Sequence, residues 1–201
     1  MARLLITRHG QTKENADGIM QGKEHGNVSE GGFEQINKLI ERLKCEKIDK
    51  IISSDIPRCK VTTKEILEKI KVPVKYTPLI REKDNGEWAG KKHKDIKWGD
   101  IEGTFETRKA PSGENLLEVR ERGRKFFEEL TEKFKDKDIT ILIVAHGAFL
   151  KIFIGNLLGM TIQDSISKLC IEHCSLTEIE IDNKYKEGYK FNFINDTSHL
   201  K

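Results

Sequence analysis

The sequence contains no internal repeat, no low-complexity linker and no strong excess of one charge. Its 36 lysines and arginines nearly balance 33 aspartates and glutamates, and the two kinds of residue are interleaved along the chain. A net charge of +3 is too small and too evenly spread to indicate a nucleic-acid partner. Because the 201 residues suit one sizeable core, we predict one domain over residues 1–201.

Cysteine is scarce, and the 4 cysteines show no paired CxxC spacing. This usage favours a reduced, intracellular protein, so we expect a cytoplasmic location. Cys170, His173 and Cys174 have the residue types of a metal site, but a second ligand pair with finger-like spacing is missing. We therefore predict core or surface thiols at these positions, with no metal and no other cofactor.

Long hydrophobic runs are missing as well. The first apolar run is too short for a signal peptide and is followed by no cleavage pattern. The stretch 139–160 is long enough to span a bilayer, yet it contains His146, Lys151 and Asn156. A buried strand followed by an amphipathic helix explains this stretch better, so we expect no membrane partner.

Short apolar runs alternate with helical patterns along the chain. This alternation predicts an α/β fold, with a mostly parallel sheet covered by helices on both faces. Ser29 is expected to cap one helix, and Asp55 to cap a second helix that has Pro57 in its first position. Strands are predicted near residues 4–7, 51–53, 72–76, 139–145, 177–181 and 189–194, and two further helices over about 114–135 and 148–158.

Two polar segments have no sustained period. The loop from Gln11 to about Val28 is too long to be a simple connection, so we expect it to have a function. The segment from about 81 to 113 contains glycines and both tryptophans, Trp88 and Trp98. We predict that this second segment is a lid-like insertion.

The motif His-Gly follows two of the apolar runs, at His9 and at His146. If both strands lie parallel in one sheet, the two imidazoles emerge at the same carboxyl edge, where open α/β sheets bind their ligands. Arg8 would lie at the same edge, and Arg58 would join it from the first turn of a helix. We therefore expect these four side chains to share one site.

Two guanidiniums and two imidazoles together suit a tetrahedral oxyanion, because the planar forks of arginine match phosphate oxygens bidentately. The helix predicted after His146 would add backbone N–H donors and the positive end of its dipole, beginning at Gly147. An imidazole aimed at phosphorus can also act as a nucleophile. The residues alone leave two alternatives open, a catalytic histidine and a structural hydrogen-bonding histidine.

Other designs for phosphoryl transfer do not fit the sequence. A GxxxxGK[ST] segment is absent, which excludes a nucleotide P-loop. None of the cysteines is followed six residues later by arginine, as a cysteine-nucleophile phosphatase loop would require. A DxDxT motif of the haloacid dehalogenase type occurs at Asp136, Asp138 and Thr140, but it precedes a predicted strand and does not follow one. We interpret it as a polar helix-to-strand connection.

Four segments, in this order, resemble the histidine phosphatase superfamily, the phosphoglycerate mutase-like family. They are LLITRHGQTKEN at 4–15, SSDIPR at 53–58, LIREKDNGEWAG at 79–90 and VAHGAFL at 144–150. The resemblance extends over nearly the whole chain and implies the three-layer α/β sandwich of that family.

The resemblance also implies the roles of site residues. His9 corresponds to the phosphorylated nucleophile, and Glu82 is the candidate proton donor. The expected phosphate pocket consists of Arg8, Asn15, Gln21, Gly22, Arg58, His146 and Gly147. The implied reaction is metal-independent hydrolysis of a small phosphate monoester through a phosphohistidine, with inorganic phosphate as a product.

Some positions depart from the family pattern. His25 stands where aspartate is common, and Asn27 where proline is common, and both lie in a loop near the expected substrate site. The tail NDTSHL at 195–200 is similar to tails of small phosphatase members, such as broad-specificity and α-ribazole phosphatases. Mutase members are generally longer, with an insertion around the lid.

Two other functions remain as alternatives. A phosphoglycerate mutase would use the same residues and hold the leaving alcohol, and a non-catalytic binder of phosphorylated ligands would be expected to have lost His9 or Glu82. The sequence does not identify the alcohol or the oligomeric state. Trp88, His93 and Trp98 are the lid residues considered as contacts of the alcohol.

Overall fold

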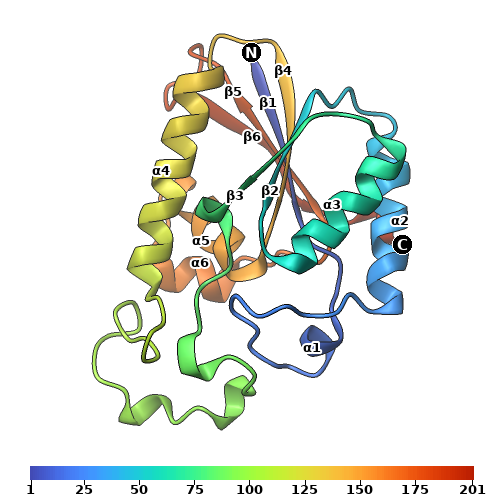
Figure 1. Ribbon diagram of the computed structural model, residues 1–201. Coiled ribbons are helices and arrows are strands. Elements are labelled where there is room, and N and C mark those ends of the chain that lie inside the picture. Colours follow the sequence, from blue (N-terminus) through green and yellow to red (C-terminus); the bar gives the residue numbers. More distant parts are fainter.

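The computed structural model describes residues 1–201 and contains a six-stranded sheet between two layers of helices (Figure 1). The strands are β1 (Ala2–Arg8), β2 (Lys50–Ser54), β3 (Val74–Thr77), β4 (Ile139–Ala145), β5 (Leu176–Ile181) and β6 (Tyr189–Asp196). Their order across the sheet is β3-β2-β4-β1-β5-β6. β1 to β4 pair in parallel, and β5 is antiparallel to both of its neighbours. The predicted mostly parallel sheet is confirmed.

The helices are α1 (Lys13–Ala16), α2 (Glu30–Leu43), α3 (Pro57–Lys69), α4 (Leu116–Phe134), α5 (Gly147–Leu157) and α6 (Ile162–Lys168). In Figure 1, α2 and α3 lie on one side of the sheet, and α4, α5 and α6 lie on the other. Successive residues of β1 face opposite cores, because side chains alternate along a strand. Leu5 packs in the core that contains α2 and α3 residues, and Leu4 packs in the core that contains α4 and α5 residues. The three-layer α/β sandwich is therefore confirmed.

The caps of two helices test the local predictions. Ser29 caps α2, since its side chain accepts a hydrogen bond from the Gly32 N–H. The prediction for Asp55 is wrong, because the N-cap of α3 is Ile56 and makes no side-chain cap bond. The Asp55 carboxylate instead accepts two bonds from the Arg81 guanidinium, the first at 2.6 Å. This ion pair ties the end of β2 to the start of the 81–113 segment.

Two short helices were not predicted. α1 lies within the loop that follows β1 and has no buried residue, so it carries no apolar period. Its cap is Thr12, whose side chain accepts from the Asn15 N–H while Asn15 bonds back to the Thr12 backbone. α6 is also too short to show a period, and only Ile162 and Ser165 of it are buried.

The 81–113 segment contains three short 3₁₀ turns and no longer helix. Its apolar side chains form a small separate cluster of Trp88, Ile96 and Ala110. Met20, from the loop after β1, packs against this cluster. In Figure 1 the segment is green and lies at the same end of the sheet as α1. The two polar segments noted in the sequence thus pack together at the carboxyl ends of β1 and β4.

Other sequence features also have clear places in the fold. Asp136 and Asp138 lie in the connection between α4 and β4, as interpreted. All four cysteines are free thiols, with Cys174 buried and Cys170 exposed. No three histidine, cysteine, aspartate or glutamate side chains are grouped so that they could hold a metal ion. None of the helices is both long enough and apolar enough to cross a bilayer.

Candidate active site

The two His-Gly segments meet because β1 and β4 are neighbours in the sheet. Arg8 is in register with Ala145, and the His9 N–H donates to the Ala145 carbonyl at 3.1 Å. The imidazoles of His9 and His146 consequently lie edge to face, with ring centroids 5.3 Å apart. The structure thus brings the two histidines together at one edge of the sheet.

The contacts of His9 fix its tautomer. Its Nδ1 lies 2.8 Å from the Gly10 carbonyl oxygen, which can only accept, so Nδ1 carries the proton. Its Nε2 lies 3.1 Å from Nε of Arg58, which can only donate, so Nε2 carries the lone pair. Arg58 is held by the Gly22 and Glu24 carbonyls, which accept from its two terminal nitrogens at 2.8 and 2.9 Å. His9 is therefore a neutral imidazole with its basic nitrogen at the guanidinium.

Burial and positive charge keep the site histidines neutral. Burial, and then the guanidiniums of Arg58 and Arg8, hold the pKa of His9 well below its ordinary value. Burial also lowers the pKa of His146 well below the usual range, with Arg58 adding to the effect. A neutral imidazole can act as a nucleophile without first losing a proton.

Arg8 has donor capacity that the protein does not use. One of its terminal nitrogens donates to the Ile171 carbonyl at 2.8 Å, whereas its buried Nε has no partner. Burial lowers the pKa of this guanidinium from its ordinary value. Gly147 lies so close that a Cβ added there would be 3.0 Å from Arg8 Cζ. A buried cation with an unpaired N–H is energetically unfavourable, and a bound anion would supply the missing partner.

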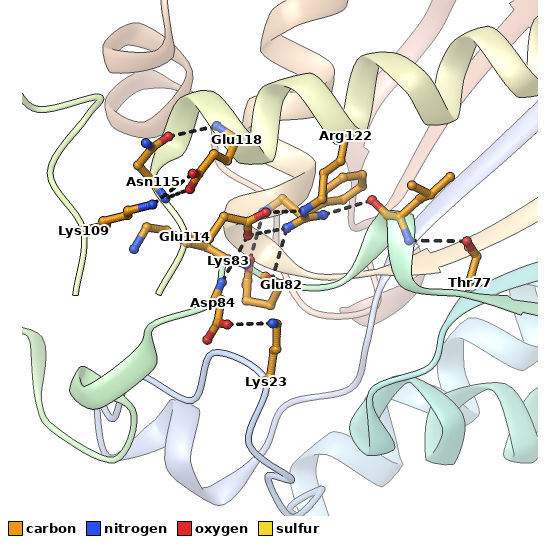
Figure 2. A network of polar contacts seen from close by, with 12 residues as sticks. Lys23, Thr77, Glu82, Lys83, Asp84, Lys109, Glu114, Asn115, Glu118 and Arg122 are labelled. Atoms are coloured by element: carbon orange, nitrogen blue, oxygen red, sulfur yellow. Dashed lines mark hydrogen bonds and ion pairs between the residues drawn. The ribbon is translucent and has the colours of Figure 1, made fainter. Parts of the chain in front are cut away.

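Glu82 lies at the N-terminus of α5. Its carboxylate accepts from the backbone N–H groups of Lys83 (3.0 Å), Ala148 (3.2 Å) and Phe149 (3.0 Å). The N–H donors expected to bind phosphate at this helix end are therefore used, at Ala148 and Phe149, by the Glu82 carboxylate. Arg122 fixes the backbone here, since it donates to the Glu82 carbonyl at 3.2 Å while pairing with Glu114 (Figure 2).

A cavity of about 450 Å³ opens in front of these residues. Seven of the nine predicted site residues line it: Arg8, His9, Asn15, Gln21, Gly22, Arg58 and Glu82. His146 and Gly147 are absent from its wall. His146 is fully buried next to His9, and its Nε2 lies 2.8 Å from the Ser54 hydroxyl and 3.4 Å from the Cys59 sulfur. The structure thus places His146 behind the nucleophile candidate and not at the cavity surface.

Two residues of the predicted pocket, Gln21 and Gly22, have structural roles. Gln21 donates from Nε2 to the Thr12 hydroxyl at 2.7 Å, while its buried Oε1 has no partner. Gly22 has φ +55°, a conformation that favours glycine, and an added Cβ would lie 2.8 Å from the Asn85 nitrogen. Glycine at position 22 therefore lets the loop after β1 touch the 81–113 segment.

His173 also belongs to the site, although the sequence did not identify it as a site residue. Its ring lies edge to face with His9, at a centroid distance of 5.5 Å. Its Nε2 is 3.1 Å from the Asn15 Oδ1, and because an amide oxygen only accepts, Nε2 must donate. Burial and the charge of Arg8 lower the pKa of His173 to about 3. Asn15 Oδ1 also accepts from the Thr12 hydroxyl at 3.0 Å, so the amide is held from two sides.

The residues whose roles the sequence leaves unassigned lie in different surroundings. His93 and Trp98 line the cavity. Trp88 belongs to the small apolar cluster of the 81–113 segment and does not line the cavity. His25 is exposed on the loop after β1 and does not reach the cavity wall.

The chain is similar to known proteins over nearly its whole length. The model of the family described as Histidine phosphatase superfamily (branch 1) matches residues 4–196. A probable phosphatase of Schizosaccharomyces pombe is 31% identical, with 99% of this chain and 95% of that protein covered. An adenosylcobalamin/alpha-ribazole phosphatase of Escherichia coli is 26% identical, with 91% and 92% covered. The structure of YhfR from Bacillus stearothermophilus matches with a TM-score of 0.88 at 24% identity, and both chains are fully covered.

Proposed function

The chain belongs to the histidine phosphatase superfamily, and we propose that it hydrolyses a small-molecule phosphate monoester through a phosphohistidine, without a metal ion. The observation that carries this proposal is the state of His9. Its Nε2 lone pair faces the Arg58 guanidinium at the wall of a cavity that Arg8 also lines. This combination suits attack on a phosphorus atom whose oxygens are bound by Arg8 and Arg58.

In the first step, Nε2 of His9 forms a bond to phosphorus and the P–O bond to the alcohol breaks. The electron pair of that bond stays on the departing oxygen, which takes a proton from the Glu82 carboxyl. In the structure, Arg58 donates its Nε–H to His9 Nε2. This N–H must therefore turn to a phosphate oxygen as the imidazole attacks. The unused Nε–H of Arg8 offers a second donor for the charge on the non-bridging oxygens.

In the second step, the Glu82 carboxylate accepts a proton from water as that water attacks phosphorus. The bond from phosphorus to Nε2 breaks, which returns the lone pair to His9 and releases inorganic phosphate. The three backbone N–H bonds to Glu82 hold its carboxylate beside the cavity through both steps. We propose that Asn15 binds a phosphate oxygen through its amide N–H groups and that His146 and Gly147 support the pocket from behind.

Activity is expected to survive EDTA and to be blocked by vanadate, since the proposed pocket is built from cations and needs no metal. A panel of phosphate esters, assayed by phosphate release with the chelator present, tests this proposal. Vanadate should compete with the ester, because it offers the same oxyanion to Arg8 and Arg58. Complete loss of activity in EDTA, restored by a divalent ion, would contradict the mechanism.

The alternative mutase activity is separated by its products. The enzyme would be assayed with 3-phosphoglycerate, with and without a bisphosphate primer. We expect free phosphate in both cases and no primer-dependent conversion to the isomeric phosphoglycerate. Isomerisation that requires the primer would identify a mutase, and binding without turnover of any ester would identify a non-catalytic binder.

His173 should act as a positioning residue for Asn15. His173→Leu removes the donor to Asn15 Oδ1, so the amide is held from one side only and KM should rise about 3- to 10-fold, the effect of one hydrogen bond. kcat should change less, because His9 and Glu82 remain. His173→Gln can supply an N–H donor and should recover part of the loss, whereas His25→Leu, at an exposed position, should have no effect. An unchanged KM in His173→Leu would show that Asn15 does not depend on His173.

A further inference from the structure

The outer part of the cavity differs from the phosphate pocket in being formed largely by the 81–113 segment. That segment contributes Lys83, Asn85, His93, Trp98, Phe105 and Arg108 to the wall. Two of these side chains, Lys83 and Arg108, are cations, and neither has a role in the reaction proposed above. The surroundings of these two cations indicate what they bind.

Three of the four carboxylates around Lys83 are already paired with another cation, as Figure 2 shows, and the fourth, that of Glu82, accepts three backbone N–H bonds. Asp84 pairs with Lys23 at 2.6 Å, Glu114 with Arg122 at 2.7 Å, and Glu118 with Lys109 at 3.0 Å. The Lys83 ammonium itself has only the Asn85 Oδ1 at 3.4 Å and the face of the Trp88 ring, 5.7 Å from its centroid. Burial lowers the pKa of Lys83 from its ordinary value, so its charge is held at a cost.

Arg108 is likewise without a carboxylate. Its Nε donates to the Thr104 carbonyl at 3.2 Å, and one terminal nitrogen donates to the Trp98 carbonyl at 3.1 Å. These two carbonyls orient the guanidinium but leave its charge uncompensated. The other terminal nitrogen of Arg108 makes no hydrogen bond to the protein.

The charge of the whole wall is unbalanced. Four cations line the cavity, Arg8, Arg58, Lys83 and Arg108, against one carboxylate, that of Glu82. A phosphate monoester bound at Arg8 and Arg58 would compensate those two guanidiniums and leave the two outer cations without a counter-charge. Cations removed from water are stabilised when an anion is brought to them.

We propose that the physiological substrate carries a second anionic group on its alcohol part, a carboxylate or a further phosphate, and that Lys83 and Arg108 bind it. The apolar side chains of Ile19, Met20 and Phe105 in the same wall would contact the carbon skeleton between the two anions. This inference rests on the proposed function, because it assigns the outer cavity to the leaving group of the same reaction. The 81–113 segment then selects the substrate and covers it as a lid.

Three esters of equal chain length test the inference. They are propyl phosphate, 3-phosphonooxypropanoate and propane-1,3-diyl bisphosphate, which present a methyl group, a carboxylate and a phosphate at the far end. All three have a primary alkoxide leaving group, so differences in kcat/KM report binding of that end. We expect kcat/KM to be at least about tenfold higher for one or both charged esters, the effect of one charge-assisted hydrogen bond. Which charged ester is preferred distinguishes the carboxylate from the phosphate.

Substitutions test whether Lys83 and Arg108 cause the preference for charged esters. In Lys83→Met the ratio of kcat/KM between the preferred charged ester and propyl phosphate should fall about tenfold, and Lys83→Arg should retain most of it. Lys94→Met is the matched control, since Lys94 is an exposed lysine of the same segment that does not line the cavity. If circular dichroism shows that Lys83→Met does not fold, the same ratio measured in Arg108→Met tests the inference independently.

Each outcome bears on a different statement. Equal kcat/KM for the three esters in the wild-type enzyme overturns the inference and leaves the phosphatase in place. A preference that persists in both Lys83→Met and Arg108→Met overturns the assignment to these residues. A folded wild-type enzyme that hydrolyses no ester of the wider panel overturns the proposed function itself.

Discussion

His9→Ala is expected to abolish turnover and the phosphate labelling of the protein. The variant removes the Nε2 lone pair that the proposed first step requires, and no other cavity-lining side chain accepts a hydrogen bond from Arg58. Loss of a covalent nucleophile lowers kcat by about 10⁴-fold or more. Phosphate release and acid-labile, base-stable labelling from a radioactive ester would be measured on the same preparations.

His146→Ala is the informative comparison for this loss. His146 is buried behind His9 and does not line the cavity, so its removal should weaken the site but leave a trace of labelling on His9. His9→Ala should still bind vanadate through Arg8 and Arg58, which would show that the pocket remains folded. Labelling that persists in His9→Ala would mean that another histidine is the nucleophile.

The sequence predicted well the part of the site that depends on neighbouring strands. Two apolar runs ending in His-Gly were enough, because parallel neighbours in one sheet deliver the residues after them to one edge. Arg58 was also predictable, since Pro57 suits a first helical position and fixes where the helix begins. These inferences need only local patterns and one rule of topology.

The anchoring of Glu82 could not be predicted, because it depends on contacts between distant parts of the chain. Its carboxylate reaches the N–H groups of Ala148 and Phe149, 66 and 67 residues away in sequence. For the same reason Asp55, which has the sequence of a helix cap, pairs with Arg81 from the other segment. A charged side chain with a guanidinium within reach gains more from that partner than from a backbone N–H.

His173 was missed because the sheet was treated as mostly parallel. β5 is antiparallel to β1, so the residues just before β5 lie at the carboxyl edge of β1. The Cys174 N–H accordingly donates to the Arg8 carbonyl at 3.0 Å, which places His173 beside His9. The signal that could have found it is a polar residue immediately before a late strand that pairs antiparallel with the first.

Glu82→Gln is the second variant with a large expected effect, and the effect should depend on the leaving group. Removal of a general acid costs about 10²- to 10⁴-fold when the departing alkoxide is poor. Alkyl phosphates should therefore be hydrolysed far more slowly by the variant. The phosphorylation step with p-nitrophenyl phosphate should be much less affected, since nitrophenolate leaves without a proton.

The second step would still lack its base in Glu82→Gln, because an amide cannot take a proton from the attacking water. The variant should release a rapid burst of nitrophenol, about one per enzyme, and then turn over slowly while phosphohistidine accumulates. Stopped-flow absorbance would show the burst directly. A glutamine can place its oxygen against the N–H groups of Lys83 and Phe149, but its NH₂ would then face the Ala148 N–H, so melting temperatures should be compared in parallel.

Glu87→Gln is the matched control for Glu82→Gln, because Glu87 is an exposed carboxylate of the same segment and does not line the cavity. It should leave both steps unchanged. If Glu82→Gln slows aryl and alkyl esters by the same factor without a burst, Glu82 is not the group that moves the proton. Asp84 would then be the next carboxylate to test, although its pairing with Lys23 at 2.6 Å holds its pKa below the ordinary value and so leaves little of the protonated form that could donate a proton.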